Sequence, residues 1–168
     1  DPDDVRRQVG YLSQDSRLFF GTLRQNLMLG HPHATEAELI QALRISGAIT
    51  MVQQDAASLD RLINEGGRGL SGGQRQMVLL SRLIVRNPQI VLLDEPTASM
   101  DEQLEAWVIR QLQQWLTGRT LILVTHRPAL LNLVDRIVVM ENGKIIADGP
   151  RDSLLKQAQN NSNVASIA

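Results

Sequence analysis

The sequence predicts an α/β fold built on a mostly parallel sheet. Two short apolar runs, residues 89–93 and 120–124, have the length and composition of strands that are buried on both faces. Amphipathic helical patterns alternate with these runs, which is typical of domains with a parallel sheet. The chain has 168 residues, of which 43% are hydrophobic, so it can form one domain with a substantial core.

The first expected element is a short strand within residues 6–15, RRQVGYLSQD, which ends at Gln14. The side chains expected to face the core are those of Val9, Tyr11 and Leu12. Residues 22–29 can form a short helix.

The next helix has a clear start signal. Thr35 is followed three residues later by Glu38, which is the pattern of a capping box. Gly47 ends the apolar stripe that follows, which consists of Leu39, Ile40, Leu43 and Ile45. Residues 48–62 predict one or two further short helices, and the glycine-rich residues 64–69, NEGGRG, predict a loop.

Two longer helices flank the first apolar run. The helix expected over residues 74–86 stops at Asn87 and Pro88, because proline restricts the residue before it and cannot continue a helix. Gly118 can end the helix expected over residues 102–116, whose apolar side consists of Leu104, Trp107, Val108, Leu112 and Trp115.

The C-terminal part predicts a hairpin over residues 136–149. Its Asn142–Gly143 pair suits a type I′ turn. A last helical turn or two is expected over residues 152–157, and residues 158–168 are expected to form a flexible polar tail.

Composition argues against some classes of site and partner. The net charge is -1, whereas a general nucleic-acid binder usually carries a basic stripe, so nucleic acid is not an expected partner. The chain has no cysteine, which excludes disulfides and thiolate metal sites.

Four polar side chains follow predicted strands, and they are Gln14, Asp94, Glu95 and His126. The carboxyl ends of parallel strands meet at one edge of a sheet, where ligands bind, so we expect the four to converge. Asp94 and Glu95 should point different ways because side chains alternate along a strand. One carboxylate could hold Mg²⁺ while the other orients or deprotonates a water; alternatively, the two acids end the strand and are solvated.

The stretch LSGGQ, residues 70–74, predicts a helix start. Ser71 and Gln74 form a second capping box, and Gly72 and Gly73 leave this start free of side chains. The free amides and the positive end of the helix dipole could bind an anion, although an ordinary capped helix is the alternative. His126 could hydrogen-bond a terminal phosphate or play a structural part.

The order of these motifs is more specific than any one of them. The chain carries, in order, Gln14, LSGGQRQ (70–76), IVLLDEPTASMD (90–101) and THR (125–127). This order resembles the nucleotide-binding domain of ATP-binding cassette (ABC) transporters, and the resemblance covers nearly the whole chain. The resemblance implies a P-loop NTPase-like ABC ATPase core with a mostly parallel sheet. It further implies a domain over residues 1–157 with a small α-helical signature subdomain over about residues 22–86. ATP and Mg²⁺ are the implied cofactors.

The resemblance also implies a role for each motif residue. Gln14 would be the Q-loop glutamine that reaches Mg²⁺ and the attacking water, and Asp94 the Walker B aspartate that holds Mg²⁺. Glu95 would be the catalytic base and His126 the switch histidine. The signature would bind the γ-phosphate of ATP held by the opposite subunit, and its residues are Ser71, Gly72, Gly73 and Gln74. Asp101, a further residue expected to bind the nucleotide, would end the D-loop ASMD, in which Met100 replaces the usual leucine.

The family's Walker A phosphate loop, GxxxxGK[ST], is not found in the sequence. The only Gly-Lys pair, Gly143–Lys144, is followed by Ile145. We expect the chain to be the C-terminal part of a nucleotide-binding domain, truncated before the Q-loop strand and inactive alone. In the family, the Walker A strand lies beside the strand that carries His126. We therefore expect the chain to repack or self-associate.

Within the family, LFFGTLRQNL (18–27) resembles exporters, and NEGGRGLSGGQRQ (64–76) looks most like bacterial type I secretion and bacteriocin-export ATPases. The implied partners are a second nucleotide-binding domain in a homodimer of the intact protein, a transmembrane domain, a periplasmic adaptor and an outer-membrane channel. The implied location is the cytoplasmic face of the bacterial inner membrane. The alternatives are a stand-alone soluble ABC ATPase or regulatory partner, and a non-catalytic interaction module; Glu95 and His126 argue against the last.

Overall fold

The computed structural model describes residues 8–53 and 58–165. The chain divides into two compact units, residues 1–126 and 127–168, and each is described by itself. The expectations for residues 6–7, 54–57 and 166–168 lie outside the described residues.

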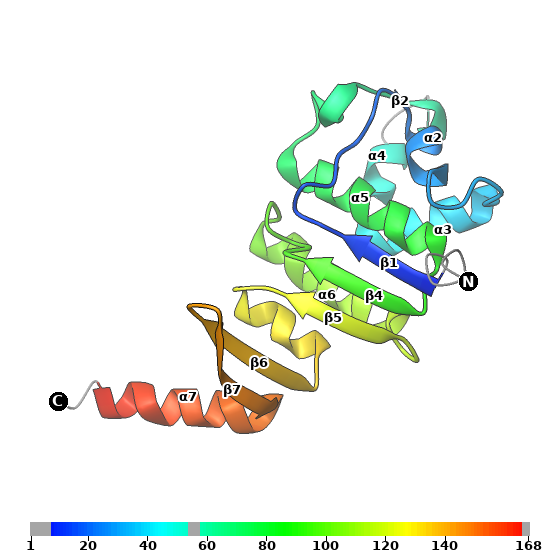
Figure 1. Cartoon of the computed structure of the whole chain (residues 1–168). Helices are drawn as coiled ribbons and strands as arrows, with labels where there is room; N and C mark the ends of the chain where they lie inside the picture. The colour runs from blue at the N-terminus through cyan, green and yellow to red at the C-terminus, as the bar shows by residue number, and fades with distance from the viewer. Residues whose placement is uncertain (1–7, 54–57, 166–168) are drawn as a thin grey trace. The chain divides into compact units, whose positions relative to one another are not determined.

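The first unit is built on a three-stranded parallel sheet with the order β1–β4–β5 (Figure 1). Its strands are β1 (Val9–Leu12), β4 (Ile90–Asp94) and β5 (Thr120–Val124). Leu93 of β4 lies opposite Leu12 on one side and Leu123 on the other, so the three strands run in step. The predicted α/β fold with a mostly parallel sheet is confirmed.

Between β1 and β4 the chain forms a largely helical part. Its main elements are α2 (Leu23–Met28), α3 (Glu36–Ser46), α4 (Ile49–Gln53) and α5 (Gly72–Arg86). The shorter ones are β2 (Gly21–Thr22), the 3-10 turn η1 (Ser58–Asp60), β3 (Leu62–Ile63) and the 3-10 turn η2 (Glu65–Gly67). Helix α6 (Glu102–Trp115) joins β4 to β5. No described helix has both the length and the apolar run that crossing a lipid bilayer requires.

The local start and stop signals read from the sequence are present. Thr35 and Glu38 form the predicted capping box of α3, and Gly47 ends this helix with a left-handed φ of 86°. Ser71 and Gln74 form the second box at the start of α5, and Asn87 ends α5 in a left-handed conformation.

Helix α5 packs closely against the first strand of the sheet. A Cβ atom placed on Gly10 of β1 would lie 2.5 Å from the Leu83 Cδ1 of α5 and 2.5 Å from the Pro88 Cγ. On another side of α5, the Ser81 hydroxyl lies 2.6 Å from that of Ser46 on α3, and both serines are fully buried. Helix α5 therefore joins the sheet to the helical part of the unit.

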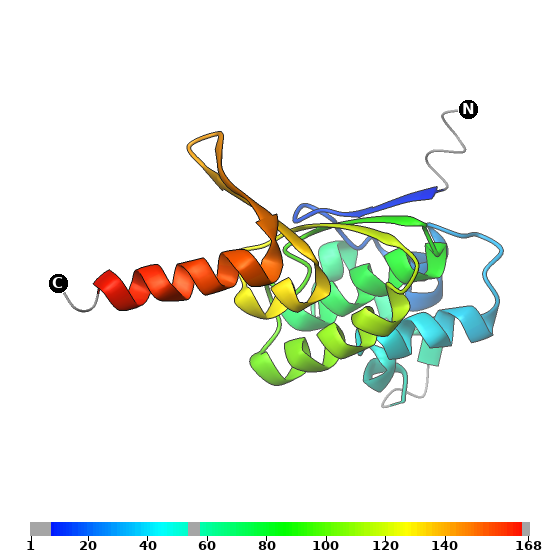
Figure 2. The same ribbon diagram turned by 90° about the horizontal axis from the view of Figure 1, so that it is seen from below.

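The expectation that the apolar strands are buried on both faces is wrong. The described helices of this unit lie on one side of the sheet (Figure 2). Because side chains alternate along a strand, every second residue faces the other way, where Tyr11, Ile122 and Val124 are 59%, 54% and 60% exposed. Tyr11, which was expected to face the core, therefore faces outward, whereas Leu12 is buried.

The second unit contains the 3-10 turn η3 (Pro128–Leu133), β6 (Arg136–Glu141), β7 (Lys144–Pro150) and α7 (Arg151–Ala165). Strands β6 and β7 form the predicted antiparallel hairpin, and positive φ values at Asn142 (49°) and Gly143 (75°) suit its turn. Helix α7 continues beyond the one or two turns expected, because the sequence after Pro150 contains neither glycine nor proline. The flexibility of residues 158–168 stays a prediction.

We expect the chain to self-associate in solution, because β5 forms an edge of the described sheet and its outer face is apolar. Multi-angle light scattering over a concentration series should show species larger than a monomer. The double variant I122K/V124K should lower the associated fraction by placing charge on the exposed face, whereas a strictly monomeric wild-type chain would contradict this expectation.

Candidate functional site

The parallel sheet places three polar segments at one edge. Gln14 follows β1 by two residues, Asp94 is the last residue of β4, and His126 follows β5 by two residues. Because the strands run in step, their carboxyl ends lie next to one another. The side chains at this edge nevertheless have different surroundings.

Glu95 is held tightly at the end of β4. Its carboxylate is 94% buried and accepts hydrogen bonds from the backbone N–H of His126 (2.8 Å) and the Thr125 hydroxyl (3.1 Å). The His126 Nδ1 lies 2.7 Å from the oxygen that the backbone N–H also meets. Glu95 has a φ of 48°, which costs a non-glycine residue about 1–2 kcal/mol, so these contacts hold it in a strained turn.

His126 is oriented by this contact but remains accessible. Its side chain is 83% exposed, and Nδ1 is engaged by the Glu95 carboxylate. The second ring nitrogen, Nε2, is therefore the one that can meet a ligand. The pair consists of a buried carboxylate and an exposed imidazole whose orientation the carboxylate fixes.

Asp94 differs from its neighbour in its surroundings. It is half-buried in the last register pair of the sheet, opposite Val124, and no described residue donates a hydrogen bond to its carboxylate. Mg²⁺ in nucleotide sites takes one or two carboxylates and completes its shell with phosphates and waters. The half-buried Asp94 carboxylate at the end of β4 is suited to be one such ligand. The described residues contain no group of three or more His, Cys, Asp or Glu side chains that could hold a metal ion.

The predicted signature residues form the start of α5. Ser71 accepts a hydrogen bond from the Gln74 N–H (3.1 Å), and the Gln74 side chain accepts one from the Ser71 N–H (2.9 Å). This capping box uses the amides of Ser71 and Gln74. The amides of Gly72 and Gly73, in the first turn of a 15-residue helix, are thus the ones suited to an anion.

The two signature glycines also allow a close contact within the chain. A Cβ atom on Gly72 would lie 3.0 Å from the Ser99 Cβ, and one on Gly73 would lie 3.1 Å from the Ser99 carbonyl oxygen. The loop that contains Ser99 is fixed by a buried hydrogen bond of 2.5 Å from the Thr97 hydroxyl to the Glu105 carboxylate. Asp101 ends this loop and caps α6 by accepting from the Leu104 N–H (2.9 Å).

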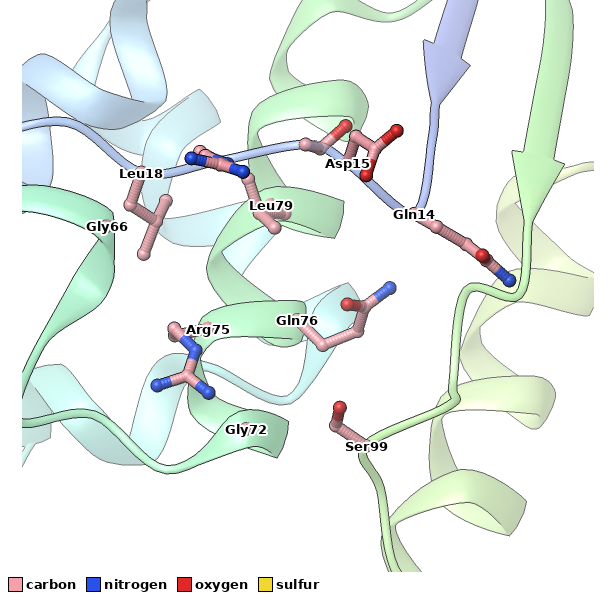
Figure 3. A pocket seen from close by; sticks show the side chains of 11 residues that line it. Gln14, Asp15, Leu18, Gly66, Gly72, Arg75, Gln76, Leu79 and Ser99 are labelled. Carbon is pink, nitrogen blue, oxygen red and sulfur yellow. The ribbon is translucent and has the colours of Figure 1, made fainter.

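A polar cavity of about 450 Å³ lies between the segment after β1 and the start of α5. Figure 3 shows the Gln14 side chain extending from the end of β1, with Gln76 and Arg75 rising from α5. The lining residues are Gln14, Asp15, Ser16, Arg17, Leu18, Gly66, Gly72, Arg75, Gln76, Leu79 and Ser99.

Predicted site residues from distant parts of the sequence thus come together in two places. Glu95 and His126 are in direct contact, and Gln14 and Gly72 line one cavity. Neither Asp94 nor the Glu95–His126 pair lines that cavity.

Sequence reasoning missed two residues of this region. Thr125 donates a hydrogen bond to the Glu95 carboxylate. Its position directly before His126 in the sequence could have indicated that it lies beside this site. Ser99 packs on the signature glycines across a long stretch of sequence, and no local pattern indicates that contact.

Comparison with known proteins connects this arrangement to one family. The family model described as ABC transporter matches residues 1–98. The leukotoxin translocation ATP-binding protein LktB of Pasteurella haemolytica-like sp. (strain 5943B) is 36% identical over 166 residues, which cover 99% of this chain and 23% of that protein. The exotoxin translocation ATP-binding protein PaxB of Pasteurella aerogenes is 36% identical over 93% of this chain and 22% of its own length.

A solved structure, of a bacterial Atm1-family ABC exporter with ATP bound, is similar in fold. Its TM-score is 0.85 at 29% identity, and the match covers 93% of this chain and 27% of that one. The chain thus spans less than a quarter of the length of these two curated relatives. The resemblance to type I secretion ATPases read from the motifs is confirmed.

We expect the substitution G72A to destabilise the first unit by about 1–3 kcal/mol, because the new Cβ would be forced against the Ser99 Cβ. In an S99G background that atom is absent, so the same substitution should cost well under about 1 kcal/mol. Urea unfolding followed by tryptophan fluorescence measures both, since Trp107 and Trp115 lie in α6. An equal cost in the two backgrounds would contradict the contact.

Proposed function

Because the chain belongs to the ABC transporter family, we propose that it is part of the ATP-hydrolysing motor domain of an exporter of the type I protein or peptide secretion class. The observation that carries the proposal is the Glu95–His126 pair at the carboxyl end of the parallel sheet. The toxin-translocation names of relatives that match nearly the whole chain support the secretion class.

We assign the chemistry of water attack to Glu95 and His126. The Glu95 carboxylate would orient and deprotonate the attacking water, which requires its release from at least one of its three present hydrogen-bond partners. His126 would present Nε2 to the γ-phosphate while Nδ1 stays directed at Glu95. The exposed position of the imidazole supports this role.

The remaining roles concern charge and orientation. Asp94 and Gln14 would hold Mg²⁺, which, when bound, neutralises charge that develops on the phosphates. The amides of Gly72 and Gly73, together with Ser71 and Gln74, would bind the γ-phosphate of ATP held by a second domain. Asp101 would fix the loop that carries Ser99 by capping α6.

This division of roles implies partners. A second nucleotide-binding domain would complete each site, in a homodimer of the intact protein, and a transmembrane domain would receive the motion. A periplasmic adaptor and an outer-membrane channel would complete the secretion route, with the motor at the cytoplasmic face of the inner membrane. We assign residues 1–157 to the motor domain and residues 22–86 to its signature subdomain; the packing of α2 and α3 on α5 supports the latter.

We expect the chain alone to bind Mg-ATP no tighter than about millimolar, a free energy near -4 kcal/mol or weaker, because its sequence lacks a Walker A loop. Isothermal titration calorimetry measures this directly. Micromolar binding would mean that another element holds the phosphates.

A chimaera tests the function itself. In the LktB of Mannheimia haemolytica, the matched 22% of the protein would be replaced by this chain. We expect the purified chimaera to hydrolyse ATP, and E95Q and H126A to lower kcat by about a hundredfold or more. The control H31A, an exposed loop histidine, should keep the activity.

Other outcomes of this experiment are equally informative. A folded chimaera that binds ATP but does not hydrolyse it with Glu95 intact would contradict the proposed motor function. ATP hydrolysis without toxin export would favour the stand-alone soluble ATPase or regulatory partner over the exporter.

A further inference from the structure

Helix α6 carries a carboxyl group on its buried face. The buried residues of this helix have the spacing of a stripe that faces the core, and they are Glu105, Val108, Ile109 and Leu112. Glu105 is only 5% exposed, although burying an acid is unfavourable unless hydrogen bonds compensate for the lost water. The sequence thus places an acid where an apolar side chain would suffice for packing.

Glu105 holds the middle of the loop between β4 and α6. The Thr97 hydroxyl, which is fully buried, donates to the Glu105 carboxylate at 2.5 Å. Backbone bonds extend from this point in both directions along the loop. The Ala98 N–H donates to the Glu95 carbonyl (3.2 Å), and the Met100 N–H donates to the Thr97 carbonyl (3.0 Å). The contact with α6 therefore lies within a series of turns that begins at Glu95.

The tip of the same loop lies against the signature. Figure 3 shows Ser99 beside Gly72 at the start of α5. A Cβ atom on Gly72 would lie 3.0 Å from the Ser99 Cβ and 3.2 Å from the Ser99 hydroxyl oxygen. Contacts this short leave no room for a methyl group unless Ser99 moves. The space at the signature glycines therefore depends on what holds the loop in place.

We propose that Glu105 is a positioning residue, which fixes the loop after Glu95 through its contact with Thr97. With the middle of the loop held, Glu95 keeps its turn of positive φ and Ser99 keeps its place on the signature glycines. Asp101 caps α6 at the far end of the loop, and the Thr97 contact is a separate attachment in the middle. The inference rests on the proposed function only for the roles of Glu95 and the signature glycines.

A double-mutant cycle in the full chain tests this placement without nucleotide. T97V removes the hydroxyl but nearly keeps the shape of the side chain, so it releases the loop from Glu105. We expect the destabilisation caused by G72A, measured by urea unfolding, to fall to half or less in the T97V background, because Ser99 can then move away from the new methyl group. T97S retains the hydroxyl and is the matched control, in which G72A should cost as much as in the wild type.

Additive costs of T97V and G72A would overturn the proposal, since they would mean that the Thr97–Glu105 contact only stabilises the fold. Hydrogen exchange of the single variants decides the question if the double variant does not fold. T97V should speed exchange at the Ala98 and Met100 amides by about tenfold or more and leave α3 unchanged. E105Q keeps an oxygen acceptor and should have a smaller effect. Unchanged exchange at both amides in T97V, or equal acceleration in α3, would overturn the proposal.

The chimaera with LktB tests the consequence for the proposed reaction. T97V should lower kcat by about tenfold and leave KM for ATP within about twofold, because the phosphate loop comes from LktB while Glu95 loses its fixed position. T97S should restore kcat. A wild-type kcat in T97V would overturn the link to Glu95. A wild-type chimaera without ATPase activity would contradict the proposed function alone, because the double-mutant cycle requires no hydrolysis and decides the placement by itself.

Discussion

The pairing of β4 with both β1 and β5 is the constraint on which the rest of the structure depends. Because the three strands are parallel and in step, the residues that follow them are delivered to one edge. The contact between Glu95 and the segment after β5 exists only through this register, since the Glu95 N–H also donates to the Val124 carbonyl. A shift of the register by one position would turn each strand side chain, including that of Asp94, to the other face of the sheet.

The parts of the fold that the sequence predicted are those encoded locally. Thr35 with Glu38, Ser71 with Gln74, and Asn142 with Gly143 each specify a cap or turn within four residues, and all three are present. The direction of Tyr11 was not predictable in this way. Its environment depends on which elements cover each face of the sheet, and an apolar run has the same appearance whether one face or both are covered.

The candidate site likewise has features that local sequence predicts and features that depend on contacts between distant residues. The motif order pointed to Glu95 and His126, but the orientation of His126 by a buried carboxylate follows from strand packing alone. Ser99 contacts Gly72 across 27 positions of sequence, and outside the site Arg82 donates to Asn26 across 56 positions. An arginine inside the apolar run MVLLSRLIV was a visible anomaly, yet its acceptors could not be identified before the fold was known.

The sheet order also bears on how the chain assembles. Ile90 of β4 pairs with Thr120 of β5 across a single helix, whereas its partner on the other side, Val9 of β1, lies 81 positions away. Closing the longer loop costs more chain entropy, and contacts between distant residues slow folding. We therefore expect β4, α6 and β5 to form the nucleus, and β1 to join once the helical part between them has become compact.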